Sequence, residues 1–165
     1  MKETFPKPAV AAIIEKTEND VRYILVQERQ KADGGADNGL LEIPAGKIRE
    51  YESIFDALIR EVWEETGLRL THIAGEAAAV KTISRGYDTV SFLPFCTTQN
   101  LSGGYSIVLH TFLCRAVGEP RPSSDETQNV RWERADTVAE LLGRNPESFY
   151  PMHINALKKY FADIR

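Results

Sequence analysis

Three glutamates within one short segment are the residues of this chain best suited to chemistry. Glu61, Glu64 and Glu65 follow the i, i+3, i+4 spacing that brings side chains together on one side of an α-helix. Carboxylates this close repel one another unless a cation lies between them, and several hard oxygen ligands suit Mg²⁺ or Mn²⁺ better than zinc. We therefore predict a helix that presents a site for Mg²⁺ or Mn²⁺.

The helix itself is expected over residues 53–66, because apolar residues recur there at helical spacing and Gly67 follows where a C-terminal cap belongs. Its apolar side, which includes Leu58, is expected to pack on the core and leave the glutamates facing a cleft. Arg60 lies four residues before Glu64. Its guanidinium is expected to orient the carboxylates or to hold the preceding loop through a bidentate pair.

The chain just before this helix is expected to approach its acidic side. A short strand ending at Ile43 leads into a turn at residues 44–46. Gly46 permits a close approach that a Cβ would block, and its carbonyl is a candidate metal ligand. Glu52 lies at the start of the helix, where free backbone amides favour a carboxylate.

The whole segment resembles the Nudix box at each of its fixed positions. From residue 46 to residue 68 it reads Gly, five residues, Glu, seven residues, then Arg-Glu-Val-Trp-Glu-Glu-Thr-Gly-Leu. The resemblance implies an α/β fold, a Nudix-type α/β/α sandwich with a mixed sheet and the box helix packed on it. It also implies a Nudix pyrophosphohydrolase, in which water attacks phosphorus to cut a diphosphate linkage in a nucleoside diphosphate derivative.

The resemblance further implies roles for particular residues. Glu61, Glu64 and Glu65 are expected to bind the metal together with the carbonyl of Gly46. Either Glu61 or a glutamate outside the box is expected to take the proton from water, and Glu126, in an acidic loop, is the candidate outside the box. The catalytic candidates are therefore Arg60, Glu61, Glu64 and Glu126.

Candidates for substrate binding lie in loops or at strand ends. Arg29, Arg85 and Lys31 have the charge to hold phosphate, and Tyr87 has a ring that can stack on a base. The expected partner is a small nucleotide: ADP-ribose, a nucleotide sugar or a nucleoside triphosphate. The three histidines share no spacing and are expected to be structural.

The branch of the family stays open. Residues 42–46 resemble the entry to the box in the ADP-ribose and nucleotide-sugar branch, but residues 69–86 lack the proline found there in dimeric ADP-ribose pyrophosphatases. An enzyme acting on nucleoside triphosphates is equally compatible with the sequence. The alternative from another class is a catalytically silent nucleotide-binding sensor, and the retention of Glu64 and Glu65 argues against it.

Composition excludes several other classes of protein. With 42% hydrophobic and 27% charged residues, the 165-residue chain has the balance of a globular protein, and we expect one domain over residues 1–165. A net charge of −4 with no long basic run argues against nucleic-acid binding. The apolar runs are too short for a membrane span, and no secretory signal is evident. We expect a cytoplasmic monomer or homodimer with both cysteines reduced in the core.

The elements that must position the box are strands and further helices. A hairpin is expected from two strands joined at Thr17–Asp20. The expected strands are residues 10–14, 21–26, 40–43, 77–83, 90–97, 105–117 and 129–132. Two more helices are expected over residues 136–142 and 152–161. This order predicts a mixed sheet covered by helices on both faces.

Overall fold

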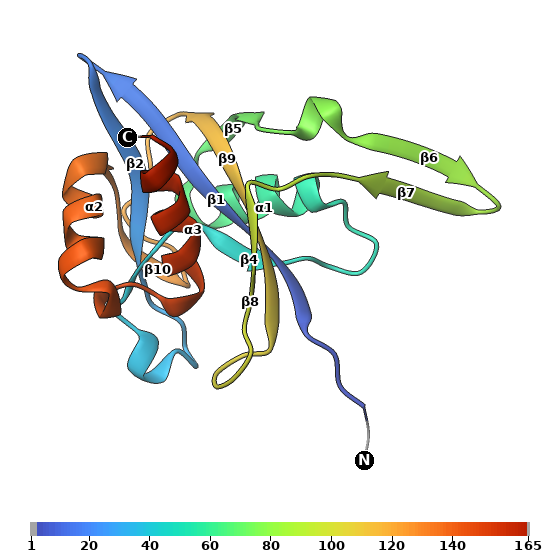
Figure 1. Cartoon of the computed structure of the whole chain (residues 1–165), viewed down its shortest axis with the longest axis horizontal. Coiled ribbons are helices and arrows are strands. Elements are labelled where there is room, and N and C mark those ends of the chain that lie inside the picture. The colour runs from blue at the N-terminus through green and yellow to red at the C-terminus, as the bar shows by residue number, and fades with distance from the viewer. Residues whose placement is uncertain (1–2, 165) are drawn as a thin grey trace.

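Helices cover both faces of an eight-stranded sheet, as the computed structural model of residues 3–164 shows (Figure 1). The strands are β1 (Lys7–Glu18), β2 (Val21–Arg29), β3 (Leu41–Glu42), β4 (Ala45–Lys47), β5 (Arg69–Ile73), β6 (Val80–Ser84), β7 (Tyr87–Ser91), β8 (Cys96–Gln99), β9 (Ile107–Val117) and β10 (Thr127–Arg134). The helices are α1 (Ile54–Thr66), α2 (Ala135–Arg144) and α3 (Pro151–Asp163). No helix in this described range is long and apolar enough to cross a membrane.

Strand β1 runs through the middle of the main sheet. The strand order is β10-β2-β1-β9-β5, with the short strands β3, β4 and β8 paired to β2, β1 and β9. Strands β1 and β9 are parallel, from the pair Lys7 and Ile107 to the pair Ile14 and Cys114, whereas the other pairings in this sheet are antiparallel. The sheet is therefore mixed, as the sequence predicts.

The hairpin expected at the start of the chain is confirmed. Strands β1 and β2 pair from Glu18 opposite Val21 onwards, so Asn19 and Asp20 form a two-residue turn. Both turn residues have positive φ, 48° and 61°. This is the backbone of a type I′ turn, whose twist matches that of the flanking strands, and Asn and Asp tolerate it.

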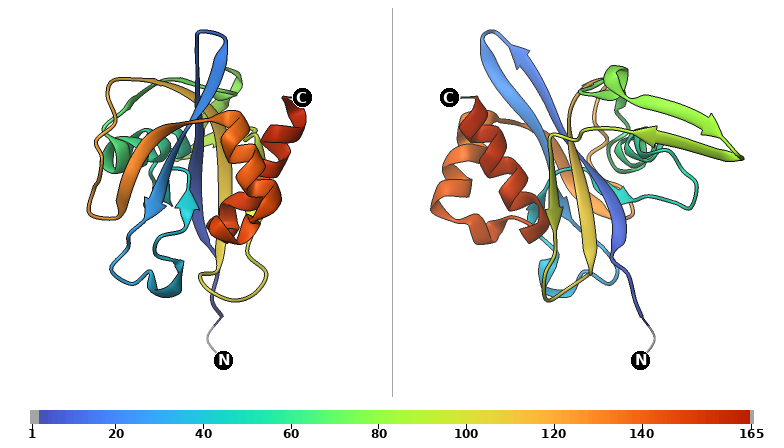
Figure 2. Two further views of the ribbon diagram at one scale, coloured as in Figure 1. Left: turned by 90° about the vertical axis from the view of Figure 1, so that its left-hand side faces the viewer. Right: turned by 45° about the vertical axis from the view of Figure 1, so that its right-hand side comes forward.

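The two faces of the sheet carry separate cores. Residues 9–14 of β1 are all buried. The even-numbered residues of this run pack with the apolar side of α1, and the odd-numbered ones pack with α2 and α3. Figure 2 shows α1 on one side of the sheet and the other two helices on the opposite side. A strand covered on both faces is apolar without interruption, which explains this run.

The ends of α1 follow local signals in the sequence. The hydroxyl of Ser53 accepts a hydrogen bond from the Phe55 amide at 3.3 Å, which caps the first turn. At the other end Gly67 has a φ of +73°, and its amide donates to the Trp63 carbonyl at 2.9 Å. Between them Leu58 is fully buried against the sheet, as predicted.

The substitution Leu58→Ala is expected to lower the free energy of unfolding by about 2–5 kcal/mol, because it leaves a cavity in the core between α1 and the sheet. The neighbouring Ile59 is 43% exposed. Ile59→Ala serves as the matched control and should cost much less. Denaturant unfolding of both variants measures the difference. Equal losses would mean that the apolar side of α1 is assigned wrongly.

The region between α1 and β9 differs from the sequence prediction. Strand β5, which was not predicted, pairs with β9. The expected strand at 77–83 is instead a 3₁₀ turn at Glu76–Ala78 followed by β6. The expected strand at 90–97 is split into β7 and β8 around Pro94, because proline cannot donate to a ladder. Strands β6 and β7 form a separate two-stranded sheet that extends away from the body (Figure 1).

Candidate active site

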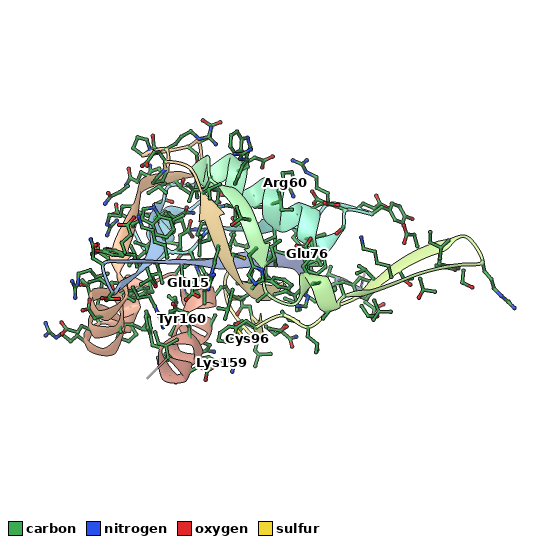
Figure 3. The ribbon with its side chains drawn as sticks, turned by 90° about the horizontal axis from the view of Figure 1, so that it is seen from above. Glu15, Arg60, Glu76, Cys96, Lys159 and Tyr160 are labelled. Carbon is green, nitrogen blue, oxygen red and sulfur yellow. The ribbon has the colours of Figure 1, made fainter. Side chains whose placement is uncertain are left out.

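Arg60 ties the loop before α1 to the acidic side of the helix. Its Nε and Nη2 donate to the two oxygens of Glu52 at 2.7 and 2.8 Å, and its Nη1 donates to Glu61 at 2.6 Å and to Glu64 at 3.2 Å. The guanidinium lowers the pKa of the Glu52 carboxyl to about 2. Both roles expected of Arg60, orienting carboxylates and holding the loop, are therefore present. Figure 3 shows Arg60 on the opposite side of the sheet from Lys159 and Tyr160 of α3.

Gly46 leaves the space in which the Glu61 carboxylate lies. Strand β4 brings it alongside β1, where Gly46 pairs with Val10. A Cβ added at Gly46 would overlap the carboxyl carbon and both oxygens of Glu61, far inside the 3.0 Å that real Cβ atoms keep. The predicted close approach of the backbone to the acidic side of α1 is thus confirmed. Burial raises the pKa of the Glu61 carboxyl.

Glu65 is the most deeply buried of the three glutamates, all of which were expected to face a cleft. It is only 3% exposed. Its Oε2 accepts hydrogen bonds from Gln27 Nε2 at 2.8 Å and from the Ala45 amide at 3.1 Å, whereas its buried Oε1 has no hydrogen-bond partner among the described residues. Burial, together with the nearby Glu42, raises the pKa of Glu65 to about 8. A buried carboxylate oxygen without a partner is costly unless a cation or a proton satisfies it.

A buried polar network lies next to Glu65. Arg29 Nη1 donates to Glu42 at 3.1 Å, and Gln27 Nε2 lies 3.4 Å from the other oxygen of Glu42. The guanidinium carbon of Arg29 is 4.2 Å from the centre of the Tyr150 ring. Pairing and stacking together fix the buried Arg29 side chain at the wall of a cavity.

This cavity, of about 440 Å³, opens in front of Glu61 and Glu64. It combines carboxylates with cationic and aromatic side chains. Its lining residues are Ala9, Arg29, Lys31, Asp33, Ala45, Gly46, Lys47, Arg49, Arg60, Glu61, Glu64, Tyr105, Ile107, Leu109, Glu126, Tyr150, Met152 and His153. A second cavity, of about 410 Å³, is lined by Glu61, Trp63, Glu64, Glu65, Arg121, Ser124, Asp125 and Glu126. Cations beside carboxylates suit a phosphate group that is held together with a metal ion.

Glu126 reaches both cavities from the loop that precedes β10. It shares them with Glu61 and Glu64, although more than 60 residues separate it from either in sequence. Its carboxylate forms an ion pair with Lys31. Its carbonyl accepts a hydrogen bond from the Gln30 amide at 2.8 Å. The structure therefore brings the candidate base to the glutamates of the box.

Comparison with known families decides what this arrangement is. A model of the NUDIX domain matches residues 5–153. The chain belongs to the Nudix family. The matched range contains the whole box, both cavities and all three glutamates, so family membership and site geometry concern the same residues.

Individual Nudix relatives support the assignment of the fold. A "MutT-like protein" of Streptomyces ambofaciens is 30% identical over 107 residues, a match that covers 65% of this chain and little more than half, 56%, of the relative. The NUDIX domain of Shewanella oneidensis NrtR, solved with ADP ribose, superposes with a TM-score of 0.67 at 14% identity over 100% of this chain and 91% of that one. A NUDIX hydrolase from Nitrosomonas europaea superposes with a TM-score of 0.61 at 23% identity. This match covers 97% of this chain and 91% of that one.

The residues of the Nudix box fit a divalent metal ion, although they do not converge on one point here. Within residues 3–164 no three acidic, histidine or cysteine side chains form a ready metal site. The reason is visible in the contacts, since Arg60 draws Glu61 and Glu64 towards itself while Gln27 holds Glu65. The unsatisfied Oε1 of Glu65 and an all-oxygen donor set nevertheless suit Mg²⁺ or Mn²⁺.

Two predicted substrate-binding residues lie away from the Nudix pocket. Arg85 and Gly86 have positive φ and form the turn of the β6–β7 hairpin, and Tyr87 follows it with 73% exposure. Neither Arg85 nor Tyr87 lines either cavity described above. The expectation that they border the pocket is therefore wrong for this structure. By contrast, Arg29 and Lys31 do line the first cavity.

The pocket also contains residues that sequence reasoning missed. Tyr105 and Tyr150 both line the first cavity, and Lys47 lies with its Nζ 5.8 Å from the centre of the Tyr105 ring. Tyr105 donates a hydrogen bond to Asp33 at 2.5 Å, which joins two loops at the rim. Their only sequence signal was a position in or next to a loop, which many residues share.

His153 was expected to be structural, and its burial and hydrogen bond agree. It is buried in α3, and its Nδ1 accepts a hydrogen bond from the Ile43 amide at 3.2 Å, so Nε2 carries the ring hydrogen. Burial, and then the charges of Arg29 and Lys31, lower the pKa of His153 to about 3. The imidazole is therefore neutral and fixed in one tautomer at the cavity wall.

This neutral histidine predicts a loss of stability on acidification. Because the pKa of His153 is 6.5 when unperturbed and about 3 in the folded protein, the unfolded chain binds the extra proton between these values. The contribution of neutral His153 to the free energy of unfolding is complete above pH 6.5. It falls by about 1.4 kcal/mol for each pH unit below that value. His153→Gln, which does not titrate, should lose less stability than the wild type between pH 7 and 5 in denaturant unfolding. Parallel losses would contradict the assignment.

Proposed function

We propose that this Nudix protein is a metal-dependent pyrophosphohydrolase that uses water to cut the diphosphate linkage of a nucleoside diphosphate derivative. One observation carries the proposal: Arg60 clamps Glu61 and Glu64 at the mouth of a cavity that is also lined by Arg29 and Lys31. This arrangement offers ligands for a hard cation next to cationic side chains for phosphate.

The proposed roles follow from the positions of the side chains. Glu61, Glu64 and Glu65, with the carbonyl of Gly46, would hold Mg²⁺ or Mn²⁺. When bound, such an ion neutralises charge on the phosphate oxygens and lowers the pKa of water. We assign the proton transfer to Glu126, since its side chain is 57% exposed and pairs with Lys31, whereas Glu61 is held by the Arg60 clamp.

The other contacts of the substrate are assigned to the remaining wall of the first cavity. Arg29 and Lys31 would pair with the phosphate oxygens. The rings of Tyr105 and Tyr150 offer faces for a base. The NrtR domain was solved with ADP ribose, so a nucleoside diphosphate joined to a sugar should be tested as a substrate alongside nucleoside triphosphates.

A panel of substrates tests the proposal. ADP-ribose, nucleotide sugars, dinucleoside polyphosphates and nucleoside triphosphates are incubated with the protein and Mg²⁺ or Mn²⁺, and again with a chelator. We expect metal-dependent release of phosphate-containing products from one class. If folded protein leaves the whole panel intact while binding one of these nucleotides, the catalytic proposal fails and a nucleotide sensor takes its place.

A further inference from the structure

The loop that carries Glu126 is fastened to the end of the box helix by Arg121. The amide of Arg121 donates to the Thr66 carbonyl at 2.8 Å. Its Nη2 donates to the Trp63 carbonyl and lies 3.3 Å from the Glu64 carbonyl. The backbone and the side chain of Arg121 therefore both hydrogen-bond to the last turn of α1.

The charges at the C-terminal end of α1 explain why the guanidinium of Arg121 lies beside it. The last turn of the helix has no basic residue of its own and contains Glu64 and Glu65. Negative side chains at a helix C-terminus oppose the helix dipole, and a cation at that end offsets them. Arg121 supplies this charge from another part of the chain. Its guanidinium also lies over Trp63, 5.5 Å from the ring centre.

Gly67, the glycine that caps α1, leaves room for this side chain. A Cβ at Gly67 would lie 2.7 Å from Nε and 3.1 Å from Cγ of Arg121. Arg121 therefore occupies space that only a glycine leaves open. The carbonyl contacts, the ring contact and the fit against Gly67 are three separate observations that fix the same side chain.

The other end of the loop is joined to the same turn of the helix. Thr127 Oγ1 donates to the Glu65 carbonyl at 3.3 Å. Ser124 bonds to Thr127 through its amide and its hydroxyl, both at 2.8 Å, and accepts from the Glu126 amide at 3.3 Å. Glu126 thus lies between two attachments to α1, one at Arg121 and one at Thr127, and it also contacts Lys31 and the Gln30 amide.

We propose that Arg121 is a positioning residue, which fixes Glu126 relative to Glu61 and Glu64 by clamping the loop to α1. The inference rests on the proposed function, because it assigns Glu126 a part in the reaction. Replacing the side chain keeps the backbone bond to Thr66, so the loop keeps its path while Glu126 gains freedom. A displaced base lowers kcat and leaves KM nearly unchanged, since Arg121 lines the second cavity but not the first, which is assigned to the substrate.

A double-mutant cycle tests this role. Arg121→Met is expected to lower kcat by about 10-fold or more with little change in KM, because small misplacements of a reacting group can cost about 100-fold. Arg121→Lys, which keeps the charge, should retain more activity than Arg121→Met. In a Glu126→Gln background the same Arg121→Met change should alter kcat by less than about 2-fold, since the two effects act through one group. Arg144→Met, on the exposed side of α2, is the control.

Amide hydrogen exchange supplies a readout that does not depend on activity. The amide of Glu126 should exchange faster in Arg121→Met than in the wild type, while amides in the middle of α1 should not change. If the fold-losses of kcat from the two single variants multiplied in the double variant, the two residues would act independently and the positioning role would be overturned. Unchanged exchange of the Glu126 amide would overturn it as well. An inactive but folded wild type would instead overturn the proposed function, and the exchange comparison would still decide whether Arg121 positions the loop.

Discussion

Replacing Glu64 with glutamine is expected to lower kcat by about 100-fold or more, because a metal ligand contributes several kcal/mol to stabilising charge in the transition state. Glu64 makes no contribution to the core. Its side chain is 48% exposed, lines both cavities and contacts Arg60 and Arg49. The amide keeps the size of the carboxylate, so the free energy of unfolding should change by less than about 1 kcal/mol, as for an exposed pair.

The matched control is Glu140→Gln. Glu140 is also an exposed helical glutamate that faces an arginine four residues away, Arg144, but it lies on α2 outside both cavities. Steady-state kinetics and thermal unfolding of both variants separate chemistry from stability. Full activity in Glu64→Gln would remove Glu64 from the metal site. Equal losses in the two variants would point to a general effect of charge.

The second large effect is expected for Gly46→Ala. Its Cβ would overlap the carboxyl group of Glu61, which must move and thereby loses its place against β4 and Arg60. We expect kcat to fall by about 100-fold, the cost that a misplacement of about 1 Å can have. The displaced atoms are the end of a flexible side chain, so the loss in free energy of unfolding should not exceed the ~1–3 kcal/mol of an overpacked core.

Gly143→Ala provides the control for adding one methyl group. Gly143 lies near the end of α2, where an added Cβ would meet no described atom within 4 Å apart from its chain neighbours and the backbone of its own helix. The helix should gain up to about 1 kcal/mol from this change, and kcat should stay the same. If Gly46→Ala retained wild-type kcat, the approach of Glu61 to the backbone of β4 would have no importance for the reaction.

The parts of the fold that the sequence predicted depend on local signals. The helix over residues 53–66 was predictable because its apolar period and its closing Gly67 both lie within one segment. The hairpin around Asn19 and Asp20 was readable for the same reason. Helices on both faces of a mixed sheet followed from the order of these elements.

The walls of the pocket were not predictable in the same way. Tyr105 and Tyr150 line the same cavity because β9 pairs with β1 and α3 packs on the sheet. These long-range contacts cannot be predicted from the sequence around either tyrosine. Arg85 and Tyr87 had suitable chemistry in a loop, but the β6–β7 hairpin does not join the main sheet. The sequence therefore indicated suitable residue types at Arg85 and Tyr87, but it did not show that they lie away from the pocket.

The inward position of Glu65 is a further limit of helical periodicity. Its spacing from Glu61 and Glu64 indicated a shared side of the helix, and all three line the second cavity, but Glu65 is buried beside the apolar residues of α1. Gln27, which lies near the end of β2, donates a hydrogen bond to it there. Because Glu28 and Arg29 follow Gln27 at this end of the strand, nothing in the local sequence set Gln27 apart as part of a buried network.

The measurement that tests the central claim most directly is hydrolysis of the preferred nucleotide in water enriched in oxygen-18, with Mg²⁺ and with chelator. The account predicts cleavage only when the metal is present, with one heavy oxygen atom in a phosphate group of one product, because water attacks phosphorus in the cavity beside Glu61, Glu64 and Glu126. Cleavage that persists in chelator, or products whose phosphates contain no heavy oxygen, would contradict it.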